Sequence, residues 1–191
     1  MARSSSRGRR VAGVAKAVGG VEFVSTAAIT AATTLVVTGI AVGYDYMISL
    51  EAFAPTDDGE VLWMRWSDDG GVSYEAGAAD YQWFTQSGTT SHQDVSDAQI
   101  DLSGNTGGND ANNTSTMQIS LFNPNASGEQ TTAIYEGYLL NTGSPSEPHP
   151  LNGNARFIQG TDAVDAVQFL WSGGSTFKAQ GDITVWRRKR S

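Results

Sequence analysis

The chain has 191 residues, a length typical of one domain, and it contains no cysteine, which excludes a disulfide scaffold and a cysteine-based zinc site. Only 17% of its residues are charged, against roughly 25% in an average domain, and this argues against a long charged helix or a coiled coil. The net charge is −8, but residues 17–186 hold three Lys or Arg against all 20 acids, a net charge of −17. This body is not expected to bind nucleic acid, because phosphate contacts require cations.

The N-terminal segment has the opposite charge. Residues 1–16 carry five cations and no acid: Arg3, Arg7, Arg9, Arg10 and Lys16. Residues 1–20 are rich in Ser, Gly, Ala and Arg, and the sequence predicts an extended basic arm over residues 1–32. Lys16 and Glu22 interrupt the apolar residues, which argues against a signal peptide. Serines and threonines dilute the uncharged residues 23–44, which argues against a membrane span.

Residues 33–186 predict one domain of short β-strands. In Tyr44–Phe53, the apolar residues Tyr44, Tyr46 and Ile48 share one parity, the pattern of a strand that is buried on one face. Clusters of Gly, Asn, Asp and Ser separate the segments at roughly 8–12-residue spacing, as in a sandwich or barrel. The expected strands are Thr33–Val42, Tyr44–Phe53, Glu60–Trp66, Val72–Tyr74, Asp80–Gln86, Ala98–Leu102, Ser115–Leu121, Thr131–Leu140, Ala155–Gln159, Val164–Trp171, Ser175–Lys178 and Asp182–Trp186. We therefore expect an all-β, jelly-roll-like antiparallel β-sandwich with an extended basic N-terminal arm.

The last expected strand ends at Trp186, and residues 187–191 are predicted to be a basic C-terminal tail. Its cations are Arg187, Arg188, Lys189 and Arg190. Together with the five N-terminal cations, they are the expected anchoring and partner-binding residues. Three uses remain open for these basic ends: contact with the acidic bodies of neighbouring subunits, contact with nucleic acid, or no contact.

The segment Ser67–Tyr74 fits the pattern S-x-D-x-G-x-x-aromatic, which resembles the Asp-box hairpin of sialidases and many other β proteins. The motif residues are Ser67, Asp69, Gly71 and Tyr74. Asp69 can accept backbone hydrogen bonds within the turn, Gly71 can adopt a positive φ, and Tyr74 can pack beneath them. The pattern occurs once, and the chain is too short for a propeller of several blades. We therefore expect a structural hairpin and not a glycosidase.

Catalytic, cofactor-binding and metal-binding residues are not expected. The adjacent carboxylates Asp57–Asp58 and Asp68–Asp69 lie in turns, whereas glycoside hydrolysis needs two carboxylates that face each other across a bond. The two histidines, His92 and His149, lie in polar loops. The sequence therefore predicts a protein that is not an enzyme and uses no cofactor.

Five tryptophans support an alternative interpretation. They are Trp63, Trp66, Trp83, Trp171 and Trp186. On a β-sandwich, aromatic rings can stack on sugars, although such rings more often lie in the core or at a subunit interface. A carbohydrate-binding module that recognises host-surface glycans is therefore an alternative function.

Several features of one segment, Val37–Trp83, occur together. They are the strand Tyr44–Phe53, the turn Pro55-Thr56-Asp57, the strand Val61–Arg65, the turn Ser67–Gly71, and Tyr81 after Gly77. This combination resembles a β-sandwich module of tailed-bacteriophage virion proteins, often labelled tail fibre or particle protein. The resemblance continues to residue 186, but the basic arm and the basic tail are not part of it.

The resemblance implies a non-enzymatic structural component of a tailed-phage virion, displayed on the particle surface in a tail fibre or appendage. We expect it to assemble as a homotrimer through its sandwich faces and to bind other virion proteins through the basic arm. The alternative within the virion is a head decoration protein, or a jelly-roll capsid protein whose basic arm faces the genome. Nucleic acid would be bound only through the basic ends, and no membrane contact is expected.

Overall fold

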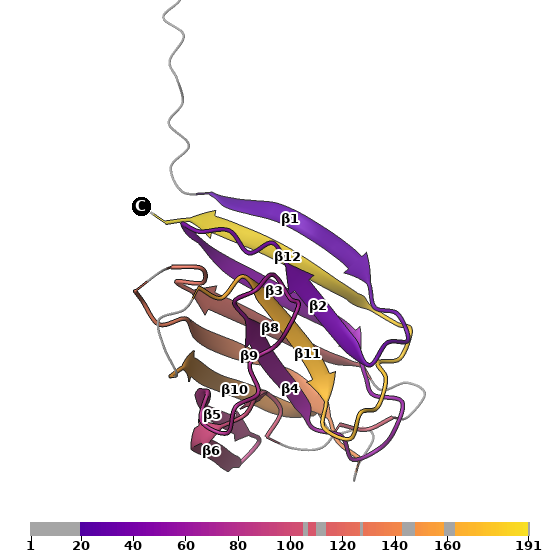
Figure 1. The fold of residues 1–191 in the computed structure, drawn as a ribbon. Helices are drawn as coiled ribbons and strands as arrows, with labels where there is room; N and C mark the ends of the chain where they lie inside the picture. The colour runs from indigo at the N-terminus through magenta and orange to yellow at the C-terminus, as the bar shows by residue number, and fades with distance from the viewer. Residues whose placement is uncertain are drawn as a thin grey trace, which may run out of the picture.

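The computed structural model describes residues 20–104, 107–109, 114–126, 128–142, 148–158 and 163–190. These residues form twelve strands and no helix (Figure 1). The strands make two antiparallel sheets that face each other. The all-β antiparallel sandwich predicted from the sequence is therefore confirmed, whereas its jelly-roll connection stays a prediction.

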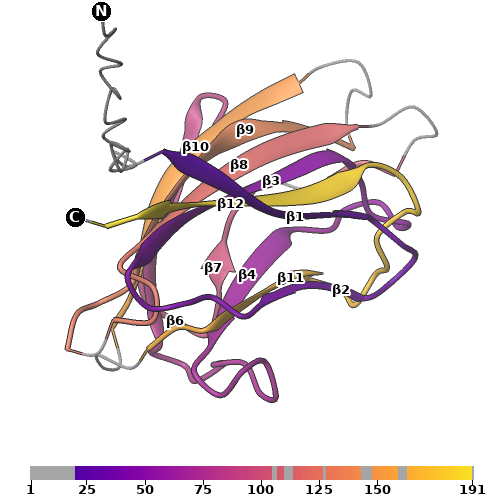
Figure 2. The same ribbon diagram turned by 90° about the horizontal axis from the view of Figure 1, so that it is seen from above.

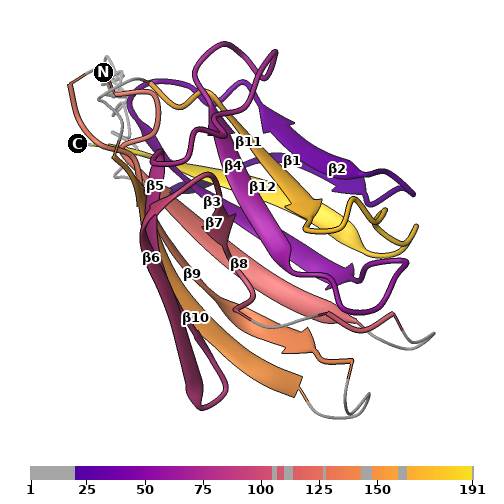
Figure 3. The same ribbon diagram turned by 60° about the horizontal axis from the view of Figure 1, so that its bottom comes forward.

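The larger sheet has eight strands in the order β1-β12-β3-β8-β9-β10-β5-β6. Their bounds are β1 Val21–Ala28, β3 Tyr44–Phe53, β5 Tyr81–Ser87, β6 Thr90–Asp97, β8 Ser115–Phe122, β9 Thr132–Leu140, β10 Pro148–Phe157 and β12 Asp182–Lys189. β1 and β6 are its two margins, and they lie at opposite ends of the sheet (Figure 3).

The smaller sheet has four strands in the order β2-β11-β4-β7. Their bounds are β2 Thr34–Thr38, β4 Leu62–Ser67, β7 Ile100–Asp101 and β11 Ala166–Trp171. Figure 2 shows this sheet as a second layer that faces the larger one. The smaller sheet therefore covers the middle of one face of the larger sheet, whereas β1 and β6 at its margins stay largely exposed.

The core lies between the two sheets, and the strand residues alternate between it and the outside. In β8, Met117, Ile119 and Leu121 are fully buried, whereas Gln118 between them is exposed. Side chains in a strand point alternately to the two faces of the sheet, so this period of two places every second residue in the core. The same alternation in the sequence was the basis for predicting these strands.

Aromatic rings join the two layers. Trp66 of β4 meets Tyr81 of β5 edge-on, with ring centroids 5.7 Å apart. The Tyr81 hydroxyl accepts a hydrogen bond from the backbone N–H of Trp66 at 2.8 Å, and Phe157 of β10 packs against the Tyr81 ring. A second cluster contains Phe53, Trp171 and Phe177. The edge-to-face pair of Trp66 and Tyr81 and the tilted contacts of the other rings add to the stabilisation from buried apolar area.

A glycine in β10 makes room for one of the core rings. Gly153 lies opposite Tyr135 of β9, and a Cβ atom at residue 153 would overlap the Tyr135 ring. The ring is held there because its hydroxyl shares a 2.7 Å hydrogen bond with the hydroxyl of Thr85 in β5. The side chain of β9 thus reaches over β10 to contact β5.

The predicted arm and the predicted tail both contain residues that form strands. Residues 21–28, expected within the arm, form β1, and residues 187–189, expected in the tail, extend β12 to Lys189. These boundary predictions are wrong because the two segments pair with each other, from Val21 opposite Arg188 to Ala28 opposite Asp182. Residues 1–19 of the expected arm and residue 191 of the expected tail lie outside the described residues.

The remaining differences have local causes. β6 was not predicted, because its polar residues show no alternation, and β10 begins at Pro148, seven residues before the expected strand Ala155–Gln159. Prolines are tolerated at the start of a strand, where a missing N–H costs little. Residues 72–74 and 175–178 were expected to be strands, but neither segment forms one.

Candidate assembly surface

The strand β1 forms one margin of the larger sheet, and no described strand lies beyond it (Figure 1). All eight of its residues are exposed. One edge of β1 pairs with β12 along its whole length. The other edge presents backbone N–H and C=O groups to the outside of the sheet, and such an edge is a template for another strand.

The other margins have features that protect a sheet edge from pairing. β6 is polar, carries Asp94 and Asp97, and has an irregular register against β5. β2 has five residues and β7 only two. β1 has no lysine and no proline; its one charged residue is Glu22, and its one irregularity lies between Phe23 and Ser25. Short length, charge, proline and bulges are the usual protection, so β1 is the least protected margin of the described sheets.

Apolar side chains continue from β1 across the outer face of the larger sheet. Phe23 lies opposite Trp186 of β12, and Trp186 lies opposite Met47 of β3. Val21 is 62% exposed and Phe23 is 58% exposed, whereas Trp186 and Met47 are half-buried. A shallow pocket lies among Val21, Met47, Trp186 and Phe122. We call Val21, Phe23, Met47, Phe122 and Trp186 the β1 patch; exposed apolar patches commonly mark interfaces.

An ion pair fastens β1 to β12 beside the β1 patch. Arg187 donates a 2.8 Å hydrogen bond from Nε to the carboxylate of Glu22, and its guanidinium lies 4.3 Å from the ring centre of Tyr44. The hydrogen bond from Arg187 lowers the pKa of Glu22, and the bond to Glu22 raises the pKa of Arg187. The single charge of β1 is therefore neutralised within the chain.

Two more of the expected C-terminal anchoring cations have acidic partners in the same chain. Arg188 Nη2 lies 3.1 Å from Asp45 Oδ2, and Arg190 Nη1 lies 3.6 Å from Glu129 Oε2. Lys189, at the end of β12, is exposed. Arg187, Arg188 and Arg190 thus balance acids of their own chain, which leaves less of their charge for a partner.

The five expected N-terminal anchoring cations lie outside the described residues. They are Arg3, Arg7, Arg9, Arg10 and Lys16. They precede the first residue of β1 in the sequence, by 5 residues for Lys16 and by 18 residues for Arg3.

The motif Ser67–Tyr74 forms a closed turn after β4. The carboxylate of Asp69 accepts hydrogen bonds from the backbone N–H of Val72 at 3.1 Å and of Ser73 at 2.9 Å. The Ser67 hydroxyl accepts one from the Gly71 N–H at 2.9 Å, and Gly71 has φ +87°. The side chains of Ser67 and Asp69 therefore satisfy the backbone of the turn, which is a structural role.

Tyr74 and Asp165 complete this turn. The Tyr74 hydroxyl lies so close to Gly71 that a Cβ atom at residue 71 would be 2.9 Å from it. The Gly70 N–H donates a hydrogen bond to the Asp165 carboxylate at 2.9 Å. Asp165 comes 95 residues after Gly70, so no local pattern could have indicated this contact.

The hydrogen bonds to Asp69 predict a pH-dependent turn. The backbone and hydroxyl of Ser73 lower the pKa of Asp69 from 3.8 to about 2. Because the folded-state pKa is the lower one, this contribution to stability is complete above pH 3.8 and is lost as the pH falls through 2. We expect the NMR shift of the Ser73 amide to titrate near pH 2 and to lose that titration in Asp69→Asn. A midpoint near 3.8 would contradict the hydrogen bonding described above.

The tryptophans lie mainly in the core. Trp66, Trp83 and Trp171 are buried, and Trp63 and Trp186 are half-buried. Trp186 belongs to the β1 patch, and Trp63 lies in β4 of the smaller sheet. The buried rings stabilise the sandwich and are not available to stack on a sugar.

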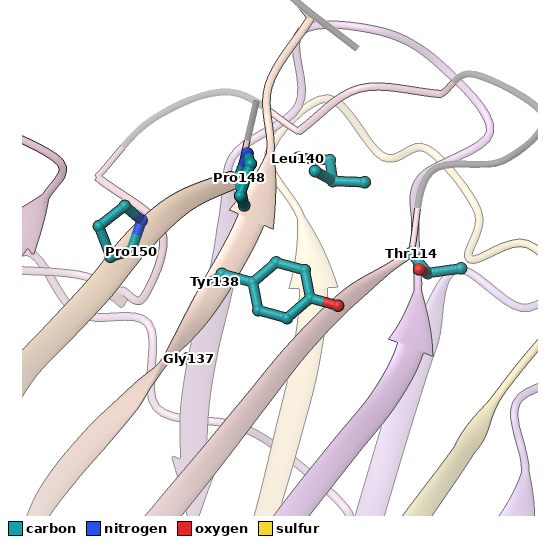
Figure 4. Close-up of a pocket in the computed structure, with 6 residues that line it drawn as sticks. All are labelled: Thr114, Gly137, Tyr138, Leu140, Pro148 and Pro150. Carbon is teal, nitrogen blue, oxygen red and sulfur yellow. The ribbon is translucent and has the colours of Figure 1, made fainter. Parts of the chain in front are cut away.

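A shallow groove lies on the outer face of the larger sheet, beside β9 and the start of β10. It is lined by Thr114, Gly137, Tyr138, Leu140, Pro148 and Pro150 (Figure 4). The Tyr138 ring is 36% exposed and lies between the other labelled side chains (Figure 4). The groove offers apolar contacts and two hydroxyls, and its lining has no carboxylate, histidine or lysine that could transfer a proton.

Asp101 is the titratable group that sequence reasoning missed. Burial raises the pKa of its carboxyl group, and its carboxylate accepts hydrogen bonds from the backbone N–H groups of Ser103 at 2.9 Å and Gly104 at 2.7 Å. These bonds hold the turn after β7. A raised carboxyl pKa often marks a catalytic acid, but here the carboxylate is occupied by its own turn.

The described part of the chain has no group of three or more His, Asp or Glu side chains that could hold a metal ion. It also has no helix that is long and apolar enough to cross a membrane. Comparisons with protein-family models, curated proteins and solved structures find no match. The function must therefore be argued from the residues of this chain.

Proposed function

We propose that the chain is a non-enzymatic structural subunit of a virus particle and that it assembles with copies of itself. The observation that carries this proposal is β1, an eight-residue edge strand that borders the exposed β1 patch. Proteins that stay separate protect such edges. The virion context comes from the resemblance to tailed-phage virion proteins. The motif Ser67–Tyr74 contributes to that resemblance as a structural hairpin and not as a catalytic site.

The strand order favours a particle-shell subunit over a tail appendage. Without β1, β12 and the β9–β10 hairpin, the sheets read β2-β11-β4-β7 and β3-β8-β5-β6. Numbered along the chain, these eight strands have the orders 1-8-3-6 and 2-7-4-5. We infer a jelly-roll connection from these orders, with the β9–β10 hairpin inserted between β8 and β5; jelly rolls are found in viral capsid and lectin domains. It supports the alternative of a jelly-roll capsid protein with a basic arm.

The charge distribution supports the same interpretation. Residues 20–190 contain seven Lys or Arg and 20 acids, a net charge of −13, so tightly packed copies would repel one another. The five cations of residues 1–16 offset part of this charge if they lie against a neighbouring subunit or against packaged nucleic acid. Because Arg187, Arg188 and Arg190 have partners in their own chain, that role falls mainly to the N-terminal cations.

Light scattering on the purified full chain tests this function. We expect a mass that is a multiple of 20.2 kDa at both low and high salt, and a larger multiple at low salt, where the N-terminal cations are less screened. A threefold multiple would match the homotrimer that the resemblance implies, whereas a twofold or other even multiple would match assembly through pairs of copies. A mass of 20.2 kDa at every salt and protein concentration would contradict a self-assembling subunit.

A further inference from the structure

We propose that two copies of the chain pair through β1, antiparallel and about a two-fold axis, so that their larger sheets join into one continuous sheet. The inference rests on the proposed self-assembly and names the surface that carries it. The open edge of β1 requires a partner in extended conformation, because only a strand can meet its backbone N–H and C=O groups in register. The question is therefore which strand pairs with it.

The side-chain sizes along β1 fit a second β1 in antiparallel orientation. Its first half, Val21–Val24, carries the large side chains of Val21 and Phe23, whereas its second half, Ser25–Ala28, carries small ones. Antiparallel pairing places the first half of one strand beside the second half of the other. Each bulky side chain then meets a small one, whereas parallel pairing would set Phe23 beside Phe23. Close cross-strand neighbours are the main source of stability in a sheet.

The charges at the two ends of β1 favour the same orientation. At its C-terminal end, Ala28 lies opposite Asp182 of β12, which lies opposite Glu51 of β3, and both acids are exposed. At its N-terminal end, β1 follows the segment with five cations. An antiparallel pair places the N-terminal end of each β1, which follows the cationic segment in the sequence, near the end that carries Asp182 and Glu51 in the other copy, and opposite charges attract. Parallel pairing would place the two N-terminal ends of β1 side by side.

The charge on the strand itself presents no obstacle. Glu22 is the one charged residue of β1, and Arg187 neutralises it. The β1 patch lies on the outer face next to the proposed junction, so pairing also brings Val21 and Phe23 of each copy against the other copy. Apolar burial of this kind is the main driving force of association. A two-fold axis joins copies in pairs, so a larger particle needs further contacts on other faces.

Single-cysteine variants test the pairing directly, because the natural chain has no cysteine and each variant has one thiol. A disulfide needs Cα atoms roughly 4.4–6.8 Å apart. Under mild oxidation of the assembled full chain, we expect Ser25→Cys, near the middle of β1, to form a disulfide-linked dimer. Val21→Cys and Ala28→Cys should each stay uncrosslinked alone and form a mixed dimer when combined. Val95→Cys, on the exposed margin β6, is the matched control and should stay uncrosslinked.

Each outcome supports or overturns the inference. Self-crosslinking of Val21→Cys and of Ala28→Cys would show parallel pairing and would contradict the proposal. An oligomer by light scattering without crosslinks at any β1 position, or with crosslinks at Val95→Cys, would overturn the β1 contact but not the self-assembly. A monomer by light scattering would overturn both.

Discussion

Trp66→Ala is expected to lower the free energy of unfolding by about 3–5 kcal/mol, the usual cost of removing a buried tryptophan. Trp66 is fully buried, and its ring packs against Tyr81 and Phe157 of the opposite sheet. Its removal leaves a cavity at the point where β4 meets the larger sheet, and this cavity cannot collapse without moving both layers. Urea denaturation followed by far-ultraviolet circular dichroism measures the loss.

Trp63→Ala is the matched control for this prediction. Trp63 lies three residues before Trp66 in the same strand but is half-buried on the other side. We expect its removal to cost at most about 2 kcal/mol, because less apolar area returns to water. Equal losses for the two variants would contradict the assignment of Trp66 to the core.

Gly181→Ala is expected to destabilise the chain more than any other glycine-to-alanine change outside the strands. Gly181 has φ +73°, and a Cβ atom there would overlap the carbonyl oxygen of Glu51. Its own carbonyl accepts a 2.9 Å hydrogen bond from the N–H of Ile29. The residue therefore sits where the end of β1, the start of β12 and the end of β3 meet. A displaced backbone there would loosen the strand that supports β1.

Gly39→Ala separates the two causes of this effect. Gly39 has nearly the same φ, +74°, but nothing lies within 4 Å of a Cβ atom at that position. Gly39→Ala should lower the free energy of unfolding only by the cost of holding an alanine in the left-handed conformation, about 1–2 kcal/mol. Gly181→Ala should cost about 1–3 kcal/mol more, the usual range for overpacking. Equal midpoints of thermal unfolding for the two variants would show that the backbone of Glu51 yields without strain.

The strands that could be predicted are those with one buried face. β3 was predicted with its observed bounds, and β8 to within one residue, because burial imposes a period of two on their sequences. β1 could not be found in this way, since its residues are exposed on both faces and nothing requires them to alternate. β6 was missed for the same reason. The two margins of the larger sheet, one of which carries the proposed assembly contact, are thus where the sequence pattern carries the least information.

The candidate site shows the same division between local and distant contacts. The turn at Asp69 was predictable, because Ser67, Asp69 and Ser73 lie within a few residues of one another. The role of the C-terminal cations was not, because the carboxylate of Glu22 that pairs with Arg187 lies 165 residues earlier in the chain. A run of basic residues looks like a free tail unless its partners are known. Here that run continues β12 and holds β1 in place.

One pair of variants tests most directly whether copies of the chain meet at β1. Lysine on an edge strand blocks strand pairing, so Val24→Lys places a charge in the middle of the proposed contact, at a residue that is already 42% exposed. Val72→Lys adds the same charge at a residue that is 88% exposed, in the turn after β4. By light scattering at equal protein concentration, we expect Val24→Lys to fall to a lower multiple of 20.2 kDa and Val72→Lys to keep the mass of the unmodified chain. An unchanged mass for Val24→Lys, with its circular dichroism also unchanged, would contradict assembly through β1.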